Sequence, residues 1–194
     1  MITAQEVKKL RDRAGAGMME CKKALKESSG DIEKAIKILQ KSGSKIADKK
    51  CGRDAAEGCI GSYIHSNGKI GVLIEVNCET DFVAKGDEFM ELAHNLAMHI
   101  AASNPKYVSY DEINPADLEN KKKEFMEEVK KENKSQEIME KIVEGRVKKY
   151  FDEICLLSQP FVKNTDLTIK ELITEKIAKT GENIKVNKFV RFEM

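Results

Sequence analysis

The sequence predicts an α+β protein: a three-helix unit at the N-terminus, then an antiparallel three-stranded sheet packed with helices and a charged helical hairpin. Two observations lead to this fold class. Apolar and other residues alternate over 70–78, which is typical of a half-buried strand. On both sides of this segment, apolar residues recur at spacings of three and four, as on one face of a helix.

The N-terminal unit is marked by three short apolar stripes with helical spacing. Gly15 and Gly17 supply flexible backbone between the first two helices. Gly30 followed by Asp31 fits a C′ glycine and an N-cap between the second and third. The stripes are Val7, Leu10 and Ala14; Met18, Cys21 and Leu25; and Ile32, Ala35, Ile36 and Leu39.

A polar stretch separates this unit from the alternating strand. Residues 42–54 combine serine and glycine with several basic residues, which favours a polar linker that can continue as helix. We therefore expect a domain at 1–41, a linker at 42–54 and a core domain at 55–194. A unit of about 40 residues buries little apolar surface, so it should lean on the core or on a partner.

A hairpin is predicted around Asn67-Gly68, because both residues tolerate the positive φ of a type I′ turn. We expect 59–65 and 69–78 to pair as antiparallel strands. A helix should follow, with five residues on one face: Phe89, Leu92, Ala93, Leu96 and Ile100. The strand-to-helix junction at 80–86 should lie at the surface, with Phe82 either packed under the helix or facing outward.

The remaining chain predicts a helical hairpin and a last strand. Asn104-Pro105 and Asn114-Pro115 are turn signals that bracket a connector. Residues 120–149 are rich in Lys and Glu and change direction near Asn133–Ser135, which indicates two antiparallel helices. Because their acids and bases are interleaved, a solvated helical hairpin is favoured over a nucleic-acid surface. Alternation over 184–194 predicts a third strand on the sheet, with its even-numbered residues on one face.

Composition narrows the class of protein. The 194 residues are 41% hydrophobic and 35% charged, and the formal net charge of +1 argues against bulk nucleic acid or an anionic membrane as main partner. No apolar run is long enough to span a membrane and no signal peptide begins the chain, so a soluble cytoplasmic protein is expected. Five cysteines without a C-x-x-C pair support neither a disulfide framework nor a zinc site. Cys78 and Cys155 are expected in the core.

Several apparent enzyme signatures fail. Gly15-Ala16-Gly17 begins like a dinucleotide fingerprint, but Glu20 occupies the third glycine position and no strand precedes it. His94 and His99 are about 140° apart around a helix, so they do not form a metal pair and should have surface or structural roles. We therefore expect no catalytic residues, no cofactor and no metal.

Five segments in order closely resemble bacterial elongation factor Ts. They are RAGAGMMECKKAL (13–25), EVNCETDFVAK (75–85), VEGR (143–146), QPFV (159–162) and FVRFE (189–193). The resemblance covers essentially the whole chain. The chain resembles the short members of this family, because the Thr-Asp-Phe-Val motif occurs in a single copy and no second hairpin-plus-helix repeat follows.

This resemblance implies a guanine nucleotide exchange factor for elongation factor Tu, the GTPase that carries aminoacyl-tRNA to the ribosome. It also implies a ubiquitin-associated-like (UBA-like) fold for 1–41. In this family the Asp-Phe pair enters the partner's GTPase domain beside its magnesium site and promotes GDP release. That role corresponds here to Asp81 and Phe82, with Thr80 and Val83 completing the motif.

The same resemblance implies further contacts with elongation factor Tu. A histidine after Ser-Tyr on a core strand packs near the partner's phosphate-binding loop, and Ser62-Tyr63-Ile64-His65 matches this pattern. Lys22 corresponds to a contact of the N-terminal domain. Val162, with Lys163, corresponds to a contact of the C-terminal part.

Short members of the family form homodimers, in which the second protomer stands in for the missing subdomain. Asp81 and His65 would then act on one partner molecule from different protomers.

Two other classes of protein stay open. An enzyme using Cys59, Cys78 and His65 would need a thiol of low pKa. An RNA- or ribosome-associated interaction protein would need a basic face and would bind less tightly as salt rises. The near-neutral charge and the missing catalytic set disfavour both, and neither nucleic acid nor membrane is expected as a direct partner.

Overall fold

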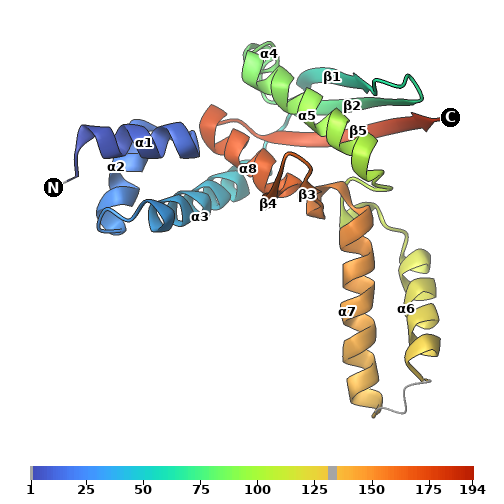
Figure 1. Ribbon diagram of the computed structural model, residues 1–194. Coiled ribbons are helices and arrows are strands. Elements are labelled where there is room, and N and C mark those ends of the chain that lie inside the picture. Colours follow the sequence, from blue (N-terminus) through green and yellow to red (C-terminus); the bar gives the residue numbers. More distant parts are fainter. Residues whose placement is uncertain (1, 131–134) are drawn as a thin grey trace.

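The computed structural model describes residues 2–130 and 135–194, and it confirms the α+β class (Figure 1). The elements in chain order are α1 (Ala4–Ala14), α2 (Met18–Glu27), α3 (Ile32–Lys50), β1 (Glu57–Ile64), β2 (Ile70–Cys78), α4 (Asp81–Ala84), α5 (Asp87–Ser103), η1 (Tyr110–Glu112), α6 (Pro115–Lys130), α7 (Gln136–Ile154), η2 (Leu156–Ser158), β3 (Pro160–Phe161), β4 (Asn164–Thr168), α8 (Ile169–Thr180) and β5 (Ile184–Glu193).

The predicted N-terminal helices form and pack around a small core of their own. Thr3 begins α1 through a capping box with Glu6, and Asp31 caps α3 by accepting a hydrogen bond from the Lys34 amide. The buried residues are Val7, Leu10, Cys21, Ala24, Leu25 and Ala35. The expected burial of Met18 is wrong, because its side chain is half exposed at the start of α2.

Helix α3 continues through much of the range expected as a linker and joins the N-terminal unit to the core (Figure 1). Its Gly43 is buried against α8, where an added Cβ would lie 3.5 Å from the Cβ of Ala178. The small residues Gly43 and Ala178 therefore let the two helices approach closely.

The sheet has the strand order β1-β2-β5, with both pairings antiparallel and β2 in the centre. Cys59 faces Val76 and Tyr63 faces Val72 across the first pairing, so the predicted hairpin is confirmed. Helix α5 covers one face of this sheet (Figure 1). The layer between them is apolar and consists of Val72, Ile74, Val76, Phe89, Leu92, Leu96 and Ile100, together with the expected core residue Cys78.

The predicted type I′ turn is wrong. Only Gly68 has a positive φ, of 67°, whereas Asn67 is not among the residues with positive φ. The Gly68 amide donates to the His65 carbonyl at 2.8 Å, and the Asn67 side chain accepts from the Lys69 amide at 2.9 Å. The chain thus turns one residue earlier than expected and uses Gly68 as the left-handed residue that re-enters the strand.

A bulge changes the faces of β5. Glu75 pairs with Lys188 while Val76 pairs with Val186, so Asn187 is an extra residue. The predicted strand is confirmed, but its expected alternation is wrong beyond this point. Because one inserted residue exchanges the two faces, Arg191 reaches the Ala101 carbonyl on α5, whereas Phe192 is 66% exposed on the opposite face.

Helices α6 and α7 form the predicted charged hairpin, which projects from the sheet domain (Figure 1). Their apolar seam contains Val129, Val143, Val147 and Phe151, with the buried Cys155 at its base. The Lys121 ammonium lies 4.5 Å from the centre of the Tyr150 ring. Of the turn expected near Asn133–Ser135, positions 133 and 134 lie outside the described residues, and Ser135 is the N-cap of α7.

His99 on α5 is completely buried and has the structural role expected for it. Its Nε2 lies 2.9 Å from Gln159 Oε1, and its Nδ1 accepts from the Val162 amide at 3.3 Å. This pattern requires a neutral ring that is protonated on Nε2. Burial lowers the pKa of His99, while the hydrogen bond to Gln159 acts in the opposite direction. The ring therefore fixes the β3–β4 turn on α5 only while it is uncharged.

A substitution at Gly58 tests the close pairing of β1 with β2 at the start of β1. Its φ is +148°, and an added Cβ would lie 2.1 Å from the Val76 carbonyl oxygen. Gly58→Ala should therefore lower the free energy of unfolding by about 3 kcal/mol in chemical denaturation. Gly71→Ala is the control, because no atom lies within 4 Å of its added Cβ, and it should change stability by less than about 0.5 kcal/mol. Equal effects of the two substitutions would contradict this packing.

His99 also predicts a pH dependence. Its folded pKa is lowered, so its contribution to stability is present above the unfolded histidine pKa of about 6.5 and is lost as the pH falls below it. Between pH 7.5 and 5.5 the melting temperature of the wild type should fall more steeply than that of His99→Gln, which cannot titrate. His94→Gln, which removes an exposed histidine from the same helix, is the matched control. Parallel slopes for wild type and His99→Gln would contradict the role of the neutral ring.

Candidate partner-binding site

The Thr80–Val83 segment forms an exposed tip where β2 leaves the sheet. Thr80 caps α4, and its hydroxyl accepts a hydrogen bond from the Val83 amide at 3.4 Å. The next residue but one, Phe82, is 84% exposed. Of the two alternatives for Phe82, packing under α5 is therefore wrong. An aromatic side chain of this exposure gains little from burial within its own chain and is available to a partner.

Asp81 gives the tip a negative charge. Its Oδ2 accepts a hydrogen bond from Lys85 Nζ at 2.7 Å, one helical turn later. This hydrogen bond and the charge of Lys85 lower the pKa of Asp81, so the carboxylate is ionised at neutral pH. Both side chains are exposed. The tip therefore presents a carboxylate beside an unburied aromatic ring.

A second group of predicted residues lies along α5. Tyr63 Oη lies 3.2 Å from His65 Nδ1, and the Tyr63 ring packs edge-on against His94 of α5 with the ring centres 5.8 Å apart. Lys163 Nζ donates to Asn95 Oδ1 at 2.8 Å, and the preceding Val162 is exposed. Because His94 and Asn95 are adjacent on α5, this helix supports both His65 and the β3–β4 turn.

The third location is α2 of the N-terminal unit. Lys22, which the resemblance gives as a contact of the N-terminal domain, is exposed there. Met18 and Met19 lie one turn earlier and are 49% and 78% exposed. The exposure of this pair was not predicted, because Met18 fits the apolar stripe of α2. Two adjacent methionines at a helix start, which cannot both face the same core, were the available signal.

The structure does not bring the predicted residues into one site. His65 precedes β2 and the tip follows it, so they lie at opposite ends of a nine-residue strand, about 30 Å apart at ~3.3 Å per residue. Figure 1 shows α4 and the β1–β2 turn at opposite ends of the hairpin. The residues predicted as contacts therefore lie in separate regions of a single chain.

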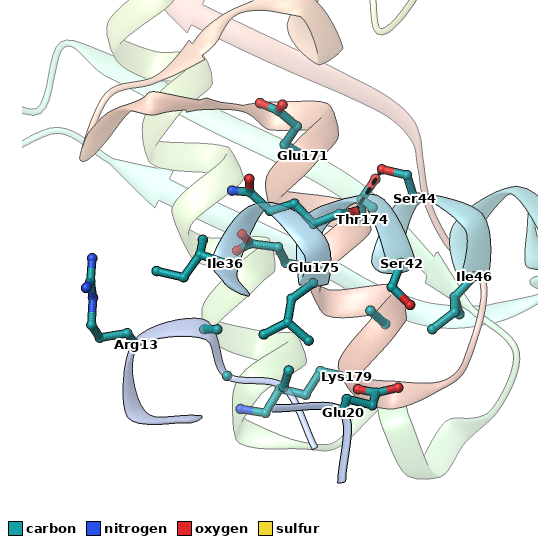
Figure 2. A pocket seen from close by; sticks show the side chains of 17 residues that line it. Arg13, Glu20, Ile36, Ser42, Ser44, Ile46, Glu171, Thr174, Glu175 and Lys179 are labelled. Atoms are coloured by element: carbon teal, nitrogen blue, oxygen red, sulfur yellow. Dashed lines mark hydrogen bonds between the residues drawn. The ribbon is translucent and has the colours of Figure 1, made fainter. Parts of the chain in front are cut away.

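A pocket of about 120 Å³ lies between the α1–α2 junction, α3 and α8, and contains none of the predicted contact residues (Figure 2). Ile36 and Leu39 form apolar parts of its wall, and Glu175 lies on the α8 side. Burial, together with the neighbouring charge of Glu171, raises the pKa of Glu175. The pocket marks where the N-terminal unit meets the core.

Thiol chemistry is disfavoured by the environment of the cysteines. Burial raises the pKa of Cys78 to about 11 and also raises that of Cys59, which is opposite to the low value a nucleophilic thiol requires. Within residues 2–130 and 135–194, no three His, Cys, Asp or Glu side chains are grouped to hold a metal ion. In the same ranges, no helix has the length and apolar character needed to cross a membrane.

Comparison with known proteins gives the family. The family described as Elongation factor TS matches residues 3–194. Elongation factor Ts of Thermodesulfovibrio yellowstonii is 56% identical over 193 residues, covering 100% of this chain and 96% of that protein. Those of Carboxydothermus hydrogenoformans and Acetivibrio thermocellus are 54% and 55% identical over 194 residues, covering 100% of this chain and 89% and 90% of theirs. The chain therefore belongs to the elongation factor Ts family.

Proposed function

We propose that this chain is a guanine nucleotide exchange factor that binds elongation factor Tu and promotes GDP release during translation elongation. Family membership supports the partner and the process. The observation that carries the mechanism is the exposed Phe82 beside an ionised Asp81 at the end of a paired strand. The factor needs no acid or base of its own, because it acts by binding.

Linkage explains how binding alone accelerates release. A nucleotide held with a Kd of ~1 nM is bound by about 12 kcal/mol, so it leaves slowly unless its pocket is remodelled. An exchange protein that binds the nucleotide-free GTPase best must weaken the binding of nucleotide. By linkage, nucleotide weakens the binding of the exchange protein to the same extent. The free energy for displacing GDP therefore comes from contacts that form only when the pocket is disturbed.

Phe82 and Asp81 are suited to provide such contacts. Burying the Phe82 ring in the partner contributes about 2–3 kcal/mol, which stabilises the displaced conformation. A carboxylate brought beside a Mg²⁺ site disturbs the electrostatic balance among the metal, its water ligands and the phosphates. The tip thereby weakens the hold of the GTPase on GDP at the metal and phosphate end of the nucleotide.

The other predicted residues extend this contact. His65 acts near the phosphate-binding loop of the partner, and Val162 with Lys163 supplies a contact from the β3–β4 turn. Lys22 serves the N-terminal unit, for which we retain the UBA-like assignment and the 1–41 boundary. The exposed Met18 and Met19 support this contact, because flexible thioether side chains adapt to an apolar partner surface. We assign the protein to the cytoplasm, where elongation takes place.

We further propose a homodimer formed through the outer face of the sheet. Helix α5 covers only the inner face, while the outer face carries a row of exposed apolar residues: Ile60, Ile64, Leu73, Val190, Phe192 and Met194. Leu73 pairs with Val190 across β2 and β5, so the row is continuous over neighbouring strands. A second copy presents the same apolar row, so two copies can bury it against each other about a two-fold axis.

Such a dimer resolves the separation of the contact residues. If the two-fold axis runs across the strands, β2 is reversed in the second protomer. The His65 end of one protomer then lies on the same side as the tip of the other. His65 and Asp81 can thus reach one molecule of elongation factor Tu from different protomers, although they are about 30 Å apart within a chain.

The alternative of an RNA- or ribosome-associated protein gains no support from the helical hairpin. Among its described residues, Lys121 pairs with Glu124 at 2.8 Å, and Lys141 pairs with Glu137 at 3.0 Å. Interleaved pairs of this kind do not build the positive field that phosphates require.

Stopped-flow release of fluorescent GDP from elongation factor Tu tests the proposed function. The wild type should accelerate release, and Phe82→Ala should slow the accelerated rate on the order of 30-fold, corresponding to the loss of about 2 kcal/mol of apolar burial. Ile138→Ala, at an exposed aliphatic position on α7, should match the wild type. If the wild type does not accelerate release, the exchange function is wrong; if Phe82→Ala matches the wild type, the role of the tip is wrong.

Sedimentation equilibrium tests the homodimer. The wild type should sediment as a dimer, and Leu73→Asp should sediment as a monomer, because it places a charge in the centre of the outer face. Ile138→Asp is the matched control, since Ile138 and Leu73 are 50% and 46% exposed and only Leu73 lies on the sheet. A monomeric wild type, or a Leu73→Asp variant that remains dimeric, would contradict this interface.

A further inference from the structure

Two reciprocal carboxylate contacts fix the base of the tip to the α8–β5 connection, a segment more than 100 residues away in sequence. Glu182, in the α8–β5 connection, accepts hydrogen bonds from both donors of Thr80: from the amide at 3.1 Å and from the hydroxyl at 2.7 Å. In return, the Glu79 carboxylate accepts a hydrogen bond from the Asn183 amide at 2.7 Å. We refer to Glu79, Thr80, Glu182 and Asn183 as the clasp.

The clasp also holds the chain that leaves α3. The second oxygen of Glu79 lies 3.3 Å from Arg53 Nη1. The side-chain amide of Asn183, a buried residue, donates to the Arg53 carbonyl at 2.8 Å and to the Cys51 carbonyl at 3.4 Å. The hydrogen bond from Asn183 and the charge of Arg53 lower the pKa of Glu79, so this carboxylate is ionised at neutral pH.

The tip needs such support because it is short. Helix α4 has four residues, too few to be stable as an isolated helix. Its N-cap hydroxyl donates to Glu182 and accepts from Val83, so one side chain links the cap of α4 to the α8–β5 connection. Only Ala84 of α4 is buried, and Phe82 is directed away from the core. The conformation of the tip is therefore set mainly at its base.

We propose that Glu182 is a positioning residue for nucleotide exchange, which pre-organises the Asp81–Phe82 pair through Thr80 before the partner is met. The inference rests on the proposed exchange function. Glu182 does not touch the partner. Because Glu182 orders the tip during folding, the tip does not have to lose conformational entropy when it enters the nucleotide pocket of the partner.

A double-mutant cycle isolates this role. Glu182→Ala should lower the maximal rate of GDP release at saturating factor by about tenfold, the order expected for the free energy of ordering one backbone residue. The half-saturating concentration should change much less, since the remaining contacts are intact. In a Phe82→Ala background, Glu182→Ala should have a smaller effect, because only Asp81 of the pair is then left to be positioned.

The matched control is Glu112→Ala. Glu112 also accepts a hydrogen bond from a backbone amide, that of Val108, at 2.7 Å, but it belongs to neither the tip nor the clasp. Its loss should lower thermal stability without a change in the exchange rate per folded molecule. Thermal unfolding of each variant shows that the protein assayed is folded.

The order of the tip can be measured without any partner. The chain contains no tryptophan, so Phe82→Trp places a single reporter on the tip. Time-resolved fluorescence anisotropy should show restricted motion of Trp at position 82, and faster depolarisation once Glu182→Ala is added. Glu112→Ala should leave the decay unchanged.

The outcomes separate this inference from the proposed function. If the wild type accelerates GDP release but Glu182→Ala matches it in rate and anisotropy, Glu182 is not a positioning residue while the exchange function stands. An equal loss of rate in the wild-type and Phe82→Ala backgrounds would overturn a role through the tip. If the wild type accelerates nothing, the exchange function fails, and the anisotropy measurement still decides whether Glu182 orders the tip.

Discussion

Backbone pairing of β2 with a strand on each of its edges is the constraint on which the other features depend. This strand is covered by α5 on one face, and its hydrogen bonds to β1 and β5 fix its direction and register. His65 therefore lies before one end and Thr80 after the other. A slip of one residue would place Val72, Ile74 and Val76 on the outer face, so the buried layer holds both predicted contact regions in place.

The contact regions are built differently from the core that carries them. The tip is stabilised by charge-assisted hydrogen bonds that the Glu182 carboxylate accepts from Thr80, whereas the most apolar residue of the tip faces solvent. The outer face of the sheet likewise leaves Phe192 exposed. These exposed aromatics contribute little to the stability of a single chain. Their burial free energy becomes available only when a partner or a second copy binds.

Local patterns predicted the elements that depend on local physics. The alternation over 70–78 predicted the hairpin, because side-chain direction along a strand repeats every second residue. The predictions for the β1–β2 turn and for the faces of β5 were wrong, and the reasons are also physical. Turn type depends on the length of the connection rather than on Asn67-Gly68 alone, and the one-residue bulge at Asn187 exchanges the faces beyond it.

The arrangement of the site could be predicted only in part. The motif predicted Asp81 and Phe82 as contact residues, but the amphipathic helix after it was equally consistent with a buried Phe82. Glu182 was missed, because it and Thr80 are 102 residues apart and no periodicity records such a contact. The expected burial of Met18 was wrong because apolar spacing describes only a preference for burial, and Met18 lies at the exposed start of α2.

Oxidative footprinting of the Phe82 side chain tests the central claim most directly, that the exposed tip enters elongation factor Tu. Hydroxyl radicals should oxidise Phe82 readily in the free protein, as its 84% exposure predicts, and far more slowly in complex with nucleotide-free elongation factor Tu. Tyr110, an exposed residue in the connector after α5, should be oxidised equally in both states and serves as an internal reference. Equal oxidation of Phe82 with and without the partner would contradict the account.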